Sequence, residues 1–182
     1  MGTSKQSRII AAVRTAEEFE NAVKSKVGII FHLSPDLHTI ADLAKTAHSY
    51  GKKLFIHLDL ATGIGKDKSG IMYVKNAGVD GVISTRVSII KAARECGVFT
   101  VQRFFAVDSQ SVDTTVEAVK SAKPDMLEIM PGVLTKVIKR LRQLVKVPII
   151  AGGLIDSVDE IEEILESGAT AISTSKKEIW DL

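Results

Sequence analysis

The chain has 182 residues, of which 45% are apolar and 25% are charged. These proportions are typical of one globular domain and exclude a disordered, collagen-like or disulfide-stapled chain. The formal net charge of +2 is too small to indicate a nucleic-acid partner by itself. A single cysteine, Cys96, excludes an intrachain disulfide and is typical of a cytoplasmic protein. No apolar run approaches the ~18 residues of a membrane span, so no membrane partner is expected.

Short apolar runs alternate with amphipathic helical patterns along the whole chain. Continuous apolar runs are typical of strands buried on both faces, which occur mainly in parallel sheets. A short apolar piece at Ile9–Val13 is expected to plug or complete the sheet. The main predicted strands are Val27–Leu33, Lys53–Leu60, Gly81–Thr85, Phe99–Phe105, Met126–Met130, Pro148–Gly153 and Ala171–Ser175.

The segments between these runs carry helix boundary signals. Thr15 with Glu18, and Ser157 with Glu160, have the spacing of capping boxes. Ser34 followed by Pro35 is expected to begin a helix, with the proline in its first turn. Helices are expected to end at Gly51, Gly78, Gly97 and Gly168.

Regular strand and helix repetition without a reversal signal favours a closed barrel over an open sheet. The chain is shorter than the ~200 residues at which such barrels usually begin. We therefore expect an α/β fold, a compact TIM-barrel-like parallel β/α barrel with about seven main strands, as a single domain over residues 1–182. An open doubly wound sheet is the alternative.

Function in such barrels lies at the carboxyl ends of the strands, and the last two strands often hold a phosphate there. Glycines let backbone N–H groups approach the anion, and Ser and Thr hydroxyls add donors. The alternative is a tight turn followed by an ordinary helix cap. The residues predicted to bind phosphate are Gly152, Gly153, Ser173, Thr174 and Ser175.

Charged residues at other strand ends are candidates for the rest of a small polyol ligand. Asp59 and Glu128 accept hydrogen bonds from hydroxyl groups, and Arg103 binds an anion or one of these carboxylates. The alternative is an internal ion network that only closes the barrel mouth. The glycine-containing segment 63–70 is either a plain flexible loop or a mobile lid whose Lys66 or Lys68 reaches the ligand anion.

One predicted helix is basic on a single face, with Lys136, Lys139 and Arg140 at helical spacing. A solvated outer face is the usual explanation of such a run, and contact with RNA is the alternative. The four histidines show no metal-ligand spacing, so we predict neither a metal nor a cofactor.

Several strings together resemble the glycerol uptake operon antiterminator regulatory proteins, the GlpP family. They occur in the order found in that family and span nearly the whole chain from Ile9 onward. The strings are Phe55–Leu60 with Gly63–Asp67, Gly81–Arg86, Gln102–Phe104, Glu128–Gly132, Pro148–Ile155, Ser173–Ser175 and Trp180.

The resemblance implies a cytoplasmic regulator that responds to glycerol-3-phosphate and acts on the leader mRNA of glycerol-catabolic genes to prevent premature termination. Such a protein is not an enzyme. Ligand binding is expected to close the 63–70 loop and to favour an RNA-competent surface or a homo-oligomer. No matched string indicates which residues contact RNA, so Lys136, Lys139 and Arg140 are the candidates from charge alone.

Two other functions use the same residues. A small barrel enzyme acting on a phosphorylated three-carbon substrate would employ Asp59 and Glu128 as acid and base. A sugar-phosphate sensor with a protein partner would need no RNA at all. Since fold does not decide function, the site must decide between them.

Overall fold

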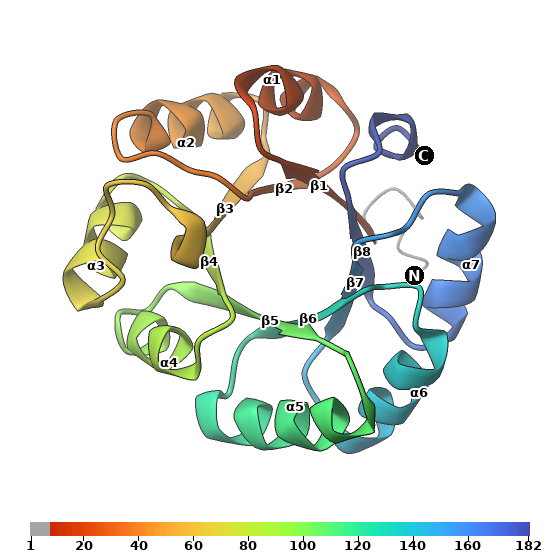
Figure 1. Cartoon of the computed structure of the whole chain (residues 1–182). Coiled ribbons are helices and arrows are strands. Elements are labelled where there is room, and N and C mark those ends of the chain that lie inside the picture. Colours follow the sequence, from red (N-terminus) through yellow and green to blue (C-terminus); the bar gives the residue numbers. More distant parts are fainter. Residues whose placement is uncertain (1–7) are drawn as a thin grey trace.

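The computed structural model describes residues 8–182, which form a closed barrel of eight parallel strands in chain order (Figure 1). The predicted TIM-barrel-like α/β fold is confirmed, with eight strands instead of about seven. The additional strand is β1 (Ile9–Val13), which pairs with β2 on one side and with β8 on the other. The short apolar piece therefore completes the sheet, because the ring cannot close without it.

The remaining strands and helices alternate as the sequence predicts. The strands are β2 (Ile29–His32), β3 (Lys53–His57), β4 (Gly81–Ser84), β5 (Phe99–Phe105), β6 (Met126–Met130), β7 (Ile149–Gly152) and β8 (Ala171–Thr174). The α-helices are α1 (Ala16–Lys24), α2 (Ile40–Ser49), α3 (Lys68–Asn76), α4 (Val87–Glu95), α5 (Ser109–Ala122), α6 (Thr135–Leu144) and α7 (Val158–Glu166). Two short 3₁₀ helices, η2 (Leu58–Leu60) and η3 (Lys177–Ile179), follow β3 and β8.

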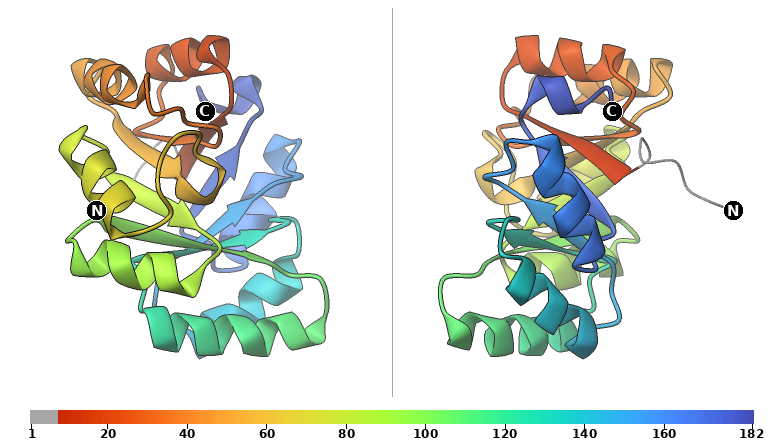
Figure 2. Two further views of the ribbon diagram at one scale, coloured as in Figure 1. Left: turned by 60° about the vertical axis from the view of Figure 1, so that its left-hand side comes forward. Right: turned by 90° about the vertical axis from the view of Figure 1, so that its right-hand side faces the viewer.

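Apolar residues form two separate layers. Alternate strand residues such as Ile9, Ala11 and Val13 pack with the helices that surround the barrel (Figure 2). The residues between them point inward, because successive side chains of a strand face opposite sides. The interior is filled by Phe31 and Phe55, whose ring centroids lie 5.6 Å apart, together with smaller side chains.

Most of the predicted helix boundaries are confirmed. Both capping boxes are present, and the four predicted stop glycines all have positive φ. The predicted helix start at Ser34 and Pro35 is wrong, since α2 begins at Ile40. Instead, the Pro35 carbonyl accepts a hydrogen bond from Thr62 N, which ties this segment to the loop after η2. No helix within residues 8–182 is both long enough and apolar enough to cross a membrane.

Candidate functional site

A polar layer lies above the apolar interior at the carboxyl ends of the strands. Arg103 in β5 and Glu128 in β6 are neighbours in register, and Arg103 Nε donates to Glu128 Oε2 at 2.6 Å. Ser173 Oγ in β8 donates to the other carboxylate oxygen, also at 2.6 Å. Glu128 is fully buried and Arg103 is only 6% exposed. Glu128 therefore fixes Arg103 and Ser173, because a buried charge is tolerated only with such partners.

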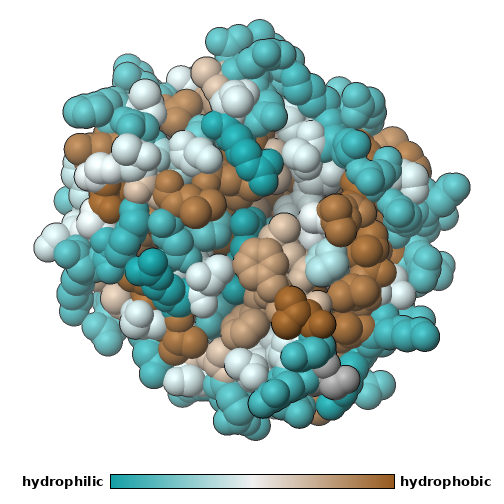
Figure 3. Space-filling model, in the orientation of Figure 1, coloured by the Kyte–Doolittle hydropathy of each residue, from teal (hydrophilic) through white to brown (hydrophobic). Residues whose placement is uncertain are grey.

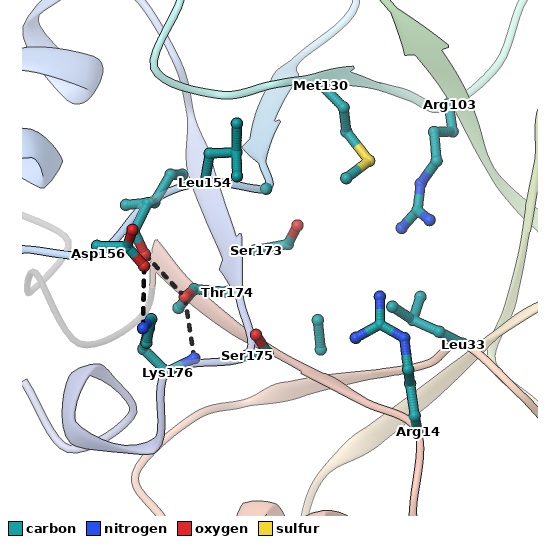
Figure 4. Close-up of a pocket in the computed structure, with 13 residues that line it drawn as sticks. Arg14, Leu33, Arg103, Met130, Leu154, Asp156, Ser173, Thr174, Ser175 and Lys176 are labelled. Carbon is teal, nitrogen blue, oxygen red and sulfur yellow. Dashed lines mark hydrogen bonds and ion pairs between the residues drawn. The ribbon is translucent and has the colours of Figure 1, made fainter.

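A pocket opens next to this layer, and two guanidinium groups point into it (Figure 4). One belongs to Arg103, and the other belongs to Arg14, which directly follows β1. No carboxylate among the described residues pairs with the Arg14 side chain. Because two converging cations repel each other, this arrangement favours an anion between or beside them. The pocket is lined by Ala12, Arg14, Leu33, Arg103, Met130, Gly153, Leu154, Ile155, Asp156, Ser173, Thr174, Ser175 and Lys176.

The loop after β7 approaches the pocket through its backbone. A Cβ on Gly152 would lie 2.6 Å from both Glu128 Oε1 and Ser173 Oγ, so only glycine fits there. Gly153 and Leu154 follow with φ of 75° and 57°, and Leu154 is 69% exposed. A leucine in this left-handed conformation is strained, and strain of this kind gathers at ligand sites.

The segment after β8 forms the facing wall. Thr174 Oγ1 donates to the Ile155 carbonyl at 3.3 Å and accepts from Lys176 N at 3.1 Å. Lys176 Nζ lies 3.1 Å from Asp156 Oδ1, across the pocket rim. These contacts join the two loops predicted to bind phosphate and bring their backbones to one pocket.

Asp59 lies outside this pocket, in η2. Its carboxylate accepts hydrogen bonds from Ser84 Oγ at 2.7 Å and from Thr85 N and Oγ1 at 2.8 and 2.9 Å. Burial acts to raise the pKa of Asp59, but these hydrogen bonds outweigh it and hold that pKa below its ordinary value. The carboxylate thus organises the loop after β4 rather than facing the arginines.

Lys66 also lies outside the pocket. Its ammonium group donates to the carbonyls of Ala61 and Ile64, the latter at 2.9 Å, and burial lowers its pKa. In this conformation Lys66 closes its own loop and does not reach toward the arginines.

The polar layer also contains a buried histidine. His57, the last residue of β3, is 3% exposed, and its Nδ1 has no hydrogen-bond partner among the described residues. Burial and the nearby Arg103 cation lower the pKa of His57 to about 4. The imidazole is therefore neutral near pH 7. Gln102 is buried too, but it alternates with Arg103 and so faces the helix layer.

The basic face predicted on a helix lies on α6, far from any strand interior. Lys136, Lys139 and Arg140 are all exposed, and Arg140 Nη2 lies 3.4 Å from Asp113 Oδ1 of α5. Their place on the outside of the barrel fits either a solvated face or a partner surface.

The structure brings together most of the predicted ligand residues. Arg103, Gly153, Ser173, Thr174 and Ser175 line one pocket, with Glu128 and Gly152 directly behind it. Sequence reasoning missed Arg14 and did not assign a role to Lys176. The available signal for Arg14 was a charged residue directly after an apolar run, but that run was not counted among the main strands. No group of three His, Cys, Asp or Glu side chains in residues 8–182 is arranged to hold a metal.

Known proteins similar to this chain show its family. A family model described as glycerol-3-phosphate responsive antiterminator matches residues 9–180. The chain belongs to this family. The antiterminator family also has solved structures, and the resemblance stated from the sequence is confirmed.

Three relatives show how similar this chain is to other proteins. The uncharacterized protein YgcP of Escherichia coli (strain K12) is 34% identical over 179 residues, covering 98% of this chain and 94% of its own. A glycerol uptake operon antiterminator regulatory protein of Listeria monocytogenes is 30% identical, with a TM-score of 0.91 and coverage of 99% and 97%. A glycerol uptake operon antiterminator-related protein of Thermotoga maritima is 31% identical, with a TM-score of 0.85 and coverage of 96% and 98%.

Proposed function

We propose that this chain is a cytoplasmic sensor of glycerol-3-phosphate that binds leader mRNA of glycerol-catabolic genes and prevents transcription termination. The observation that carries the ligand assignment is the pocket into which Arg14 and Arg103 both point. It has the cationic groups, hydroxyls and close backbone approach that recognise a small phosphate ester. The family description supports the same ligand.

In this proposal the phosphate lies against the loops after β7 and β8. Gly152 and Gly153 allow the backbone to approach the phosphate, and Thr174 and Ser175 frame the other side. Arg14 and Arg103 supply the cations for the phosphate, and Ser173 faces the glycerol part, with Arg103 and Ser173 held in orientation by Glu128. Asp59 and Lys66 organise neighbouring loops and make no direct contact in this conformation.

Arg14 provides the sharpest test. We expect Arg14→Ala to weaken glycerol-3-phosphate binding by about 10-fold or more, because a charge-assisted hydrogen bond contributes about 1.5–3 kcal/mol. Calorimetric titration of the purified protein measures this, with glycerol and inorganic phosphate as ligand controls. Arg86→Ala is the matched control, since Arg86, the N-cap residue of α4, is an exposed arginine that lies 3.8 Å from Asp59 and does not line the pocket. Wild-type protein that fails to bind millimolar glycerol-3-phosphate would remove the sensor proposal.

The enzyme alternative has less support from the geometry. Both oxygens of Glu128 and both of Asp59 already accept hydrogen bonds from neighbouring side chains or backbone. Lys176 is the lysine that lines the pocket, and its ammonium group is paired with Asp156 at 3.1 Å, whereas a Schiff base requires a neutral amine. Formation of product from glycerol-3-phosphate during the titration, lost in Glu128→Gln, would restore the enzyme alternative.

The RNA step requires that glycerol-3-phosphate bind the RNA-competent state more tightly than the other state. RNA affinity that is identical with and without the ligand would therefore contradict the proposed switch. A sensor that binds the ligand but no RNA would instead act through a protein partner.

A further inference from the structure

Two exposed apolar side chains stand at the end of β5, beside the ligand pocket. Phe105 is 52% exposed and Val107 is 81% exposed. In the face viewed in Figure 3, apolar atoms gather around part of the barrel mouth instead of spreading evenly over the rim. Exposed apolar side chains that cluster in this way mark a binding surface more often than single ones do.

A groove that begins at Ala106 and Val107 lies between the amino ends of α5 and α6, and Phe105 lines an adjacent hollow that shares Asp108 with it. Its apolar walls are formed by Val107, Val112, Leu134 and Val137. Lys136 and Arg140 of α6 line the same groove together with Asp108, so two cations and one carboxylate lie beside the apolar walls. We call Phe105 together with the four apolar wall residues and the two cations the β5–α6 surface.

The charges on this surface favour a polyanion. Helix α6 carries Lys136, Lys139, Arg140 and Arg142 and has no acidic residue. Within residues 8–182, Lys136 and Lys139 have no carboxylate partner. The nearby carboxylates are already engaged, since Asp108 caps α5 by accepting from Ser111 N and Asp113 lies beside Arg140.

Direct contacts connect this surface to the ligand pocket. Arg103 and Met130 line the pocket, and the two strands that carry them continue into the walls of the groove. Phe105 is the register partner of Met130, and Ala106 N donates to the Met130 carbonyl at 2.8 Å. A ligand that displaces the Met130 or Arg103 side chain therefore acts on the strand ends that hold Phe105 and Val107.

We propose that the β5–α6 surface binds a single-stranded RNA segment, with one base stacked on Phe105 and phosphates on Lys136 and Arg140. Single-stranded nucleic acid is recognised by aromatic rings combined with cations, and here the exposed Phe105 is combined with Lys136, which has no carboxylate partner among the described residues, and with Arg140, whose ion pair with Asp113 is exposed. This inference rests on the proposed function, and it adds both the contact surface and its connection to the ligand. By linkage, RNA on this surface raises the affinity for glycerol-3-phosphate by the same factor as the ligand raises the affinity for RNA.

The test begins with RNA selected from a random-sequence pool on the wild-type protein in the presence of glycerol-3-phosphate. Phe105→Ala should weaken binding of the selected RNA by about 5- to 150-fold, whereas Phe105→Tyr should keep it, because base stacking needs the ring. Lys136→Ala should lower affinity and reduce the salt dependence by about one phosphate contact. Glycerol-3-phosphate affinity without RNA should remain within about twofold in all three variants.

Matched controls lie on the opposite side of the barrel. Tyr50→Ala removes an aromatic side chain that is 51% exposed, and Lys45→Ala removes an exposed cation, both at α2. Neither change should affect RNA binding. All variants are compared by urea unfolding, so that a loss of folding is recognised.

The outcomes separate this inference from the proposed function. If selected RNA binds Phe105→Ala and Lys136→Ala as well as the wild type, the RNA surface lies elsewhere and the groove is left for a polypeptide partner. If RNA binds through Phe105 but glycerol-3-phosphate has no effect, the connection to the ligand is wrong while the contact surface stands. If no RNA is enriched while glycerol-3-phosphate binds, the antiterminator proposal and this inference both fail.

Discussion

At the scale of single residues, the polar layer inside the barrel shows why charge in a strand is informative. Arg103 and Glu128 stood out in the sequence because each interrupts an apolar strand. Burying these two charges is costly, and the structure shows how the cost is offset. Arg103 donates a hydrogen bond to one carboxylate oxygen of Glu128, and Ser173 donates to the other. What the sequence could not show was the direction of each side chain. Glu128 points beneath the pocket and supports it, although its residue type is equally suitable for direct contact.

His57 makes this layer sensitive to acid. Its pKa is about 4 in the folded protein and near 6.5 in an unfolded chain, so below pH 6.5 the unfolded state binds the additional proton. Stability is therefore complete above this range and falls as the pH decreases through it. We expect about 2 kcal/mol to be lost between about pH 7 and about pH 4.5, and His57→Gln should remove that part of the loss.

Urea unfolding at the two pH values measures this difference. His32, whose pKa is also lowered by burial, remains in the variant and accounts for part of the remaining pH dependence. An unchanged pH dependence in His57→Gln would show that the imidazole is already protonated or solvated in the folded protein.

At the scale of elements, the loop after β7 contains two neighbouring residues with positive φ, of which Gly153 adopts this conformation without strain and Leu154 does not. Gly153→Ala should lower the free energy of unfolding by about 1–2 kcal/mol, because φ of 75° disfavours a Cβ that would also lie 2.7 Å from Met130 Cε. Leu154→Gly should leave stability unchanged or raise it by up to about 1 kcal/mol, because the gain at φ 57° offsets the entropy of glycine.

Urea unfolding compares both variants with Gly28→Ala, a position where a Cβ meets nothing within 4 Å and φ is not positive. That control should be neutral or stabilising by about 0.4–1 kcal/mol. A destabilised Leu154→Gly would mean that the leucine side chain contributes packing that outweighs its backbone strain.

Elements with strong local signals were predictable, and those set by distant contacts were not. The capping boxes at Thr15 and Ser157 depend on residues three positions apart, and both form as predicted. The segment at Ser34 and Pro35 carries an equally good local signal, but a long-range hydrogen bond from Thr62 holds it outside a helix. For the same reason the sequence does not show that Asp59 and Lys66 lie outside the pocket that Arg14 and Arg103 line, because sequence order does not show which loops share a pocket.

At the scale of the whole molecule, closing the ring joins the first and last units. The strand β8 pairs with β1, and the segment after it folds back beside α1 (Figure 2). There Lys26 N donates to Asp181 Oδ1 at 2.9 Å, and Lys177 Nζ lies 3.2 Å from Glu17 Oε1. Arg14 and Ser175 belong to the two units joined in this way, so the pocket exists only once the barrel has closed.

Trp180 connects this closure to the ligand site. It is 2% exposed, and its Nε1 donates to the carbonyl of Thr174 at 2.9 Å, directly at the wall of the pocket. We expect Trp180→Ala to lower the free energy of unfolding by about 3–5 kcal/mol, because it leaves a large cavity beneath η3. Trp180→Phe keeps most of the bulk and loses the hydrogen bond, at a cost of about 1 kcal/mol.

If closure of the barrel by the segment after β8 positions the pocket, Trp180→Phe remains folded in urea unfolding but binds glycerol-3-phosphate several-fold more weakly in calorimetry. Unchanged binding in that folded variant would show that the wall after β8 keeps its shape without the indole, and that the closing segment contributes to stability alone.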